Sequence, residues 1–264
     1  QIGKQAFYNC RLEKINLQRV EKIHDEAFAM CERLKNIDIP DSVVYLGRGT
    51  FRACFNLSKI DIPESVTTIE FECFASCSRL KEAILPNNLE TINVQMFKGC
   101  ASLEKIHIPT NVKNIYSEAF MNTGLKEVVL PEGLQTIGNR VFNCTSIKSI
   151  VLPSSVKSIE AETFANSKML ETIDLSKTQI KKIPDSCFSN CVSLNYVNLP
   201  DTIEDISMFA FQMCQSLQEL ELPHSLKDIR YGAFQKSGLV KISLPENTTI
   251  YKAVFFDCNN LEAV

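Results

Sequence analysis

Residues 103–125 read LEKIHIPTNVKNIYSEAFMNTGL, and the same pattern returns along the whole chain. A second clear copy is LKNIDIPDSVVYLGRGTFRACFNL at 34–57. The consensus is L-x-x-I-x-L-P-x-x-V-x-x-I-x-x-x-A-F-x-x-C-x-x-L, and successive phenylalanines lie 21 to 24 residues apart, most often 23. Self-similarity at such a period is typical of a solenoid. We therefore expect residues 1–264 to form a single solenoid domain of about 11.5 repeats.

Each part of the repeat predicts a local structure. The alternation of apolar and polar residues at the end of L-x-x-I-x-L predicts a short strand with one buried face. Such strands stack into a parallel sheet with about 4.8 Å between repeats. The proline that follows ends the strand because it has no N–H for the next ladder bond. V-x-x-I then turns a second apolar pair inward, and A-F-x-x-C-x-x-L crosses back as a short helical or 3-10 turn with the phenylalanine in the core.

The two ends of the chain both fall inside a repeat. The chain opens on the phenylalanine segment and closes on LEAV264, without a polar terminal repeat. Solenoids usually need such caps to shield the last core layer. We therefore expect this chain to be part of a longer polypeptide.

Composition narrows the range of partners. The chain is 45% hydrophobic and 22% charged, with a net charge of −3. Because no basic patch stands out, nucleic acid is not expected as a partner. No apolar run is long enough to span a bilayer, so we expect no direct membrane insertion of this region. The oligomeric state is not indicated by the sequence.

The repeat resembles the leucine-rich repeats of the BspA-like (Treponema pallidum-type) class in its 23-residue length and in the positions of L-P, A-F and C. The resemblance extends over nearly all of the chain. It implies a curved right-handed solenoid, mostly β, with a parallel sheet on the concave face and short helical or extended segments opposite. It also implies a secreted or cell-surface protein that adheres to host proteins or other cells. Fold alone does not specify the partner.

The eleven cysteines mostly follow the repeat. Eight occupy one F-x-x-C column, where other repeats have Thr123, Ser167 or a residue of the Lys236–Ser237 turn, and Cys144 is the displaced equivalent in a shortened repeat. Cys73 and Cys187 precede the phenylalanine, where seven other repeats have Ala or Val. Since Thr, Ser, Ala or Val can replace Cys at these positions, they indicate small buried side chains, and a free thiol is one of these. Disulfides between stacked neighbours stay open, because about 4.8 Å between Cα atoms is a permitted separation.

A zinc site built from Cys73, Cys77, Cys187 and Cys191 fails on geometry. The two pairs lie five repeats apart, which is about 24 Å at the spacing of a sheet. We therefore expect no metal and no other cofactor. The three histidines, His24, His107 and His224, sit in different repeats, and no catalytic or phosphate-binding motif appears. The sequence predicts no catalytic residue and no enzyme.

The exposed positions of the strand supply the candidate binding site. The central apolar run in one row consists of Ile84, His107, Val129 and Val151, with acidic residues on either side. The neighbouring row contains Lys105, Glu127 and Tyr196. Contiguous apolar patches often mark interaction sites. The same residue types are also ordinary strand formers, and a segment outside this chain could cover them.

These observations lead to two functional hypotheses. The first is non-enzymatic binding of a protein, such as an extracellular-matrix or other cell-surface protein, across a rigid concave sheet. The alternative is a structural spacer that presents other domains and has no specific partner. Location at the cell surface or secretion follows from the family resemblance alone.

Overall fold

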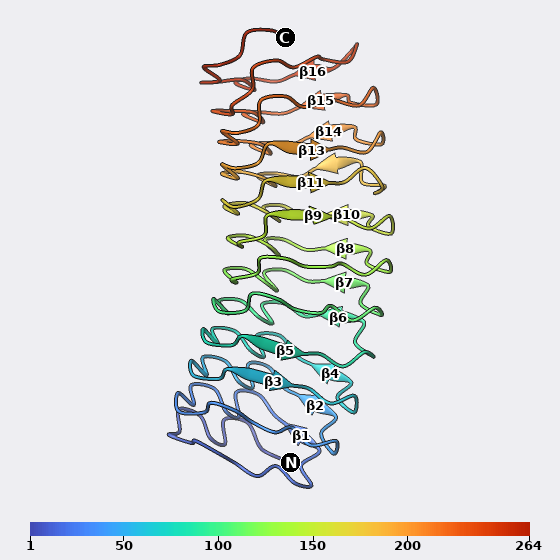
Figure 1. Cartoon of the computed structure of the whole chain (residues 1–264). Helices are drawn as coiled ribbons and strands as arrows, with labels where there is room; N and C mark the ends of the chain where they lie inside the picture. Colours follow the sequence, from blue (N-terminus) through green and yellow to red (C-terminus); the bar gives the residue numbers. More distant parts are fainter. The chain divides into compact units, whose positions relative to one another are not determined.

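A computed structural model describes all of residues 1–264 and divides them into two compact units, Gln1–Pro131 (unit 1) and Glu132–Val264 (unit 2). In both units successive repeats stack as coils of parallel strands, which is the expected solenoid architecture (Figure 1). Since the two units are described separately, a single domain over 1–264 stays a prediction.

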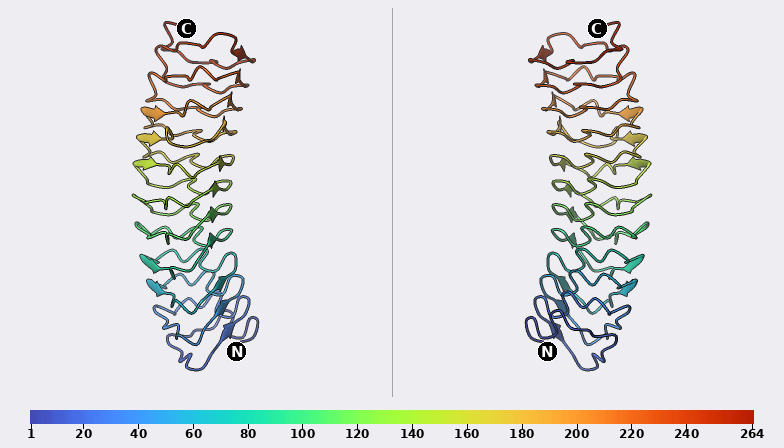
Figure 2. Two further views of the ribbon diagram at one scale, coloured as in Figure 1. Left: turned by 90° about the vertical axis from the view of Figure 1, so that its right-hand side faces the viewer. Right: turned by 90° about the vertical axis from the view of Figure 1, so that its left-hand side faces the viewer.

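The strands lie on two opposite sides of the coils (Figure 2). One side holds three-residue strands from the L-x-x-I-x-L segments, which we call the L row. The other holds two-residue strands from the V-x-x-I segments, which we call the V row. Only the L row was predicted as a sheet, because a two-residue strand shows no alternation along the sequence.

The strands of unit 1 belong to both rows. In the V row, β1 (Lys22–Ile23), β2 (Tyr45–Leu46) and β4 (Thr68–Ile69) pair in that order, and β6 (Thr91–Ile92) pairs with β7 (Asn114–Ile115). In the L row, β3 (Lys59–Asp61) pairs with β5 (Glu82–Ile84). Further along this row an isolated bridge joins His107 to Val129.

Unit 2 repeats this arrangement. In its L row, β9 (Ser149–Val151), β11 (Thr172–Asp174) and β13 (Tyr196–Asn198) pair in that order. In its V row, β8 (Thr136–Ile137) pairs with β10 (Ser158–Ile159), and β12 (Lys182–Ile183), β14 (Asp205–Ile206), β15 (Asp228–Ile229) and β16 (Thr249–Ile250) form a second sheet.

The core of each unit is a column of phenylalanines. In unit 1, six rings from Phe7 to Phe120 stack nearly parallel with centroids 5.3 to 5.7 Å apart. In unit 2, six rings from Phe142 to Phe255 stack at 5.2 to 5.7 Å. Ten of the twelve are fully buried. The prediction that this residue fills the interior is confirmed.

The segment around each phenylalanine contains no α-helix or 3-10 helix, and the structure has no helix that could cross a membrane. The helical form of the crossing was therefore not confirmed. Two residues before and two residues after every column phenylalanine, φ is positive, between 52° and 75°. Helices do not accommodate such left-handed residues.

Hydrogen bonding explains this backbone. The N–H of Phe51 donates to the carbonyl of Cys73 in the next repeat at 2.9 Å, and the N–H of Cys54 donates to Phe51 within its own turn at 3.1 Å. The backbone thus alternates between bonds inside a turn and bonds to the neighbouring coil. Consecutive turns result, and they satisfy the buried amides without a helix.

Candidate functional site

The structure brings five of the predicted site residues together in unit 1. Ile84 ends β5 and is 41% exposed, while Val129 is 83% exposed and bridges His107 on the adjacent coil. Lys105 and Glu127 form an ion pair beside them. With Glu82, Ala83, Ile106 and Val128, these residues line a hollow of about 420 Å³, which we call the unit 1 groove.

The groove coincides with an interruption of the L row. β5 pairs with β3 on one side, but no strand pairing joins β5 to Lys105–His107 on the other. The interruption has no signature in the sequence, because the repeat pattern here is the same as elsewhere.

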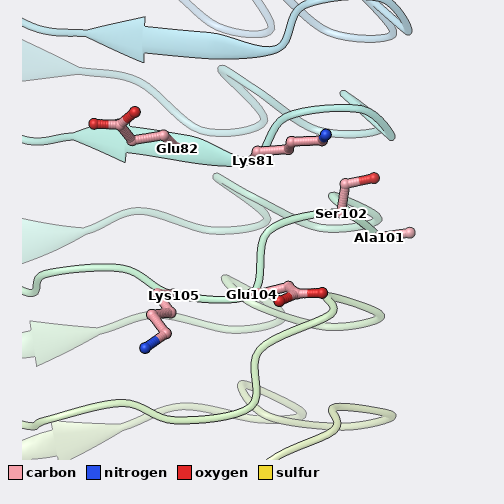
Figure 3. A pocket seen from close by; sticks show the side chains of 6 residues that line it. All are labelled: Lys81, Glu82, Ala101, Ser102, Glu104 and Lys105. Carbon is pink, nitrogen blue, oxygen red and sulfur yellow. The ribbon is translucent and has the colours of Figure 1, made fainter.

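A second hollow, of about 670 Å³, adjoins the first, since Glu82 and Lys105 line both. Figure 3 shows that two neighbouring coils supply its lining: Lys81 and Glu82 lie on one, and Ala101, Ser102, Glu104 and Lys105 lie on the next. Two lysines and two glutamates balance the charge of this wall.

The charges around the unit 1 groove are paired between coils. Lys59 lies 3.1 Å from Glu82, and Lys126 lies 2.8 Å from Glu104. The hydrogen bond from Lys126 lowers the pKa of the Glu104 carboxyl, and the bond to Glu127 raises the pKa of Lys105. Exposed pairs of this kind add little stability. Their effect is to leave an apolar strip with an electrically balanced border.

The other two predicted residues lie in unit 2. Val151 ends β9 and is 57% exposed, and Tyr196 begins β13 and is 55% exposed. Tyr196 lines a separate groove of about 480 Å³ with Asp201, Glu219, Glu221 and His224. Whether Val151 extends the apolar strip of unit 1 stays a prediction.

Most of the cysteines belong to the core. All eleven are free, and seven of the eight column thiols donate to the carbonyl oxygen of the phenylalanine in the preceding repeat, at 2.9 to 3.2 Å. Ser167 makes the same bond at 2.7 Å. Cys144 is not the column residue of its repeat: Thr145 fills that place, while Cys144 has positive φ and is exposed.

Burial makes the column thiols in the core poor nucleophiles. It raises the pKa of Cys54 and of Cys100 to about 12 and that of Cys77 well above its ordinary value. The thiolate is the form that attacks substrates and binds metals. No three His, Cys, Asp or Glu side chains are grouped so as to hold a metal ion.

Exposed aromatic residues beside the V row were missed by the sequence analysis. Phe71 is 39% exposed, and the guanidinium of Arg48 lies 5.1 Å from its ring centroid. In unit 2, Tyr231 and Tyr251 are exposed, and Arg230 lies 5.7 Å from the Tyr251 centroid. Reading the third and fourth positions before each phenylalanine as surface rows would have found them.

Comparison with known proteins identifies the repeat. The model of the BspA-type leucine-rich repeat region matches residues 1–124, 94–199 and 181–264. The chain belongs to the BspA-type leucine-rich repeat family. Solenoids of leucine-rich repeats use extended surfaces to bind other proteins. No curated protein matches this BspA-type chain.

Solved structures share the fold of this BspA-type chain. A leucine-rich repeat protein from Bacteroides ovatus is 29% identical, with a TM-score of 0.79 over 98% of this chain and 74% of that one. One from Eubacterium ventriosum is 22% identical (TM-score 0.56, 93% and 82% covered). A leucine rich cell surface protein from Faecalibacterium prausnitzii is 21% identical (TM-score 0.51, 92% and 82% covered).

Proposed function

We propose that this BspA-type protein is a non-enzymatic adhesion module that binds a protein partner through the unit 1 groove. The observation that carries the proposal is the exposed apolar strip of Ile84, His107 and Val129, bordered by paired charges. Burying such a strip in a partner gains hydrophobic free energy, and the surrounding ion pairs need not be broken.

The rigidity of the groove favours binding. Its floor residues Ala83 and Ile106 are buried, Ile84 ends strand β5, and His107 is held beside Val129 by a β-bridge. A pre-formed surface loses little conformational entropy when a partner docks. The partner class is an extracellular-matrix or other cell-surface protein, and the chain acts at a cell surface or after secretion. The F. prausnitzii relative, described as a cell surface protein, supports this location.

Surface plasmon resonance tests the proposal. The whole chain is measured for binding to a panel of purified matrix, plasma and cell-surface proteins. We expect at least one partner, and we expect the double variant Ile84→Glu, Val129→Glu to lose it. The matched control is Val44→Glu, Val94→Glu, which changes two exposed valines elsewhere in unit 1. Thermal unfolding must be the same for both variants.

A structural spacer is the competing function. It predicts no saturable partner, or a partner that both double variants bind as tightly as the parent chain. Either result would reject the unit 1 groove as the binding site.

A further inference from the structure

The groove on unit 2 differs in chemistry from the one on unit 1. It lies where the L row is interrupted: β13 pairs with β11 on one side, but no strand pairing joins β13 to Glu219–Glu221 on the other. The hollow measures about 480 Å³, and its polar lining includes Asn195, Asn198, Asp201, Glu219, Glu221 and His224. The hollow therefore lies beside a break in strand pairing, as the unit 1 groove does.

The charge of the unit 2 groove is not balanced. Its lining contains three carboxylates, from Asp201, Glu219 and Glu221, and no lysine or arginine. None of the three forms an ion pair or a side-chain hydrogen bond, whereas Glu82 and Glu127 of the unit 1 groove are both paired with lysines. Unpaired charges of one sign in a concave site concentrate field lines and attract groups of the opposite sign.

Tyr196 adds a second feature that suits a cation. The residue is 55% exposed where it lines the groove, and its hydroxyl bonds to no other group of the chain. The face of an aromatic ring attracts guanidinium and ammonium groups. Arginine is the best match, because its planar fork stacks on the ring and also bonds a carboxylate with two N–H groups.

We infer that the unit 2 groove binds a basic peptide segment of a partner protein, with an arginine seated between Tyr196 and the carboxylates of Glu219 and Glu221. This inference goes beyond the proposed function, since it concerns the other unit and commits to a cationic partner. Charge complementarity supports it, because the three carboxylates of the lining form no ion pair within the chain.

The test uses the whole chain and a fluorescent dodecapeptide that alternates arginine and serine, measured by anisotropy at about 50 mM salt. Peptides that alternate lysine or glutamate with serine are run beside it. The variants are Tyr196→Leu and the double variant Glu219→Gln, Glu221→Gln. The matched control is Glu246→Gln, Glu262→Gln, which removes two exposed carboxylates of unit 2 outside the groove.

We expect the arginine peptide to bind, the lysine peptide to bind more weakly, and the glutamate peptide not to bind. The double variant in the groove should weaken binding about tenfold or more, and Tyr196→Leu about fivefold, while the control stays within about twofold. Equal losses in the groove and control variants would show attraction by net charge alone and overturn the inference. So would the absence of binding by the arginine peptide. The peptide assay uses no natural partner. Its result therefore does not depend on whether a partner is found for the unit 1 groove.

Discussion

The thiol of Cys77 donates a hydrogen bond to the backbone carbonyl of Phe51, one repeat earlier, over 3.1 Å. Both residues are fully buried. The bond therefore joins the turn that contains Cys77 to the turn that contains Phe51 in the preceding repeat. A cysteine in this column is therefore a donor to the neighbouring coil as well as a small apolar group.

Replacing Cys77 with alanine should lower the free energy of unfolding by about 1–3 kcal/mol, because the buried carbonyl of Phe51 loses its side-chain donor and a small void remains. Serine should cost less, since Ser167 makes the same bond in its own repeat. Urea unfolding of the whole chain measures both. Cys144→Ala, at an exposed position, is the control and should change stability by less than about 0.5 kcal/mol. Equal losses for Cys77→Ala and Cys77→Ser would argue against a role for the donor.

Alkaline pH should destabilise the fold. Burial raises the pKa of Cys54, Cys100 and Cys191 to about 12, whereas unfolded thiols titrate near pH 8.5. Above pH 8.5 the unfolded chain loses thiol protons that the folded chain keeps, so stability falls with pH until the folded pKa is reached. Each such thiol contributes about 1.4 kcal/mol per pH unit in this window.

Circular dichroism between pH 7 and 11, with a reductant present, measures this loss. The double variant Cys54→Ser, Cys100→Ser, compared with itself at pH 7, should lose stability less steeply than the parent chain. Identical slopes would show that other groups, and not the buried thiols, dominate the alkaline transition.

Among single side chains, those of the phenylalanine column should contribute most to the stability of the fold. Phe74 stacks on Phe51 at 5.6 Å and on Phe97 at 5.5 Å, and it is fully buried. Phe74→Ala should cost about 3–5 kcal/mol by chemical denaturation. Phe256, which is 53% exposed, is the control, and Phe256→Ala should change stability by less than about 1 kcal/mol. Similar losses at both positions would contradict this description of the core.

Gly99 tests the left-handed backbone. Its φ is +75°, and an added Cβ would meet Ser76 at 3.5 Å, an ordinary contact distance. Gly99→Ala should therefore lose about 1–2 kcal/mol from backbone strain alone. Gly3→Ala is the control, because nothing lies within 4 Å of its added Cβ and no positive φ is found there. Thermal unfolding compares the two, and a neutral Gly99→Ala would rule out strain at this position.

The sequence predicted those features that a single repeat encodes. A large aromatic at a fixed position, such as Phe74, predicts a core column, and the register of L-x-x-I-x-L places His107 beside Val129. The positive φ of residues such as Glu72, Met213 and Phe209 was not predictable, because these side chains have no preference for left-handed backbone. Hydrogen bonds to the next coil impose that conformation, and they exist only in the stack.

The candidate site was predictable as a set of residues but not as grooves. Lys105 and Glu127 were recognised as neighbours in a row, yet nothing in the repeat indicates that the strand pairing stops beside β5 or beside β13. Both interruptions appear only in the hydrogen bonding between coils, which the repeat pattern does not specify. The difference in charge balance between the two grooves became visible only once their linings were known.

The bonds between coils have a consequence for how such a gene can change. Inside each unit the N–H of a column phenylalanine, the thiol of a column cysteine and the face of a ring meet the same position on a neighbouring repeat. Duplication or excision of about 23 codons in frame, at any point inside a unit, therefore joins two surfaces that already fit. Recombination between repeats can therefore lengthen or shorten such a protein, and change the order of its surface residues, while the contacts of the core stay the same.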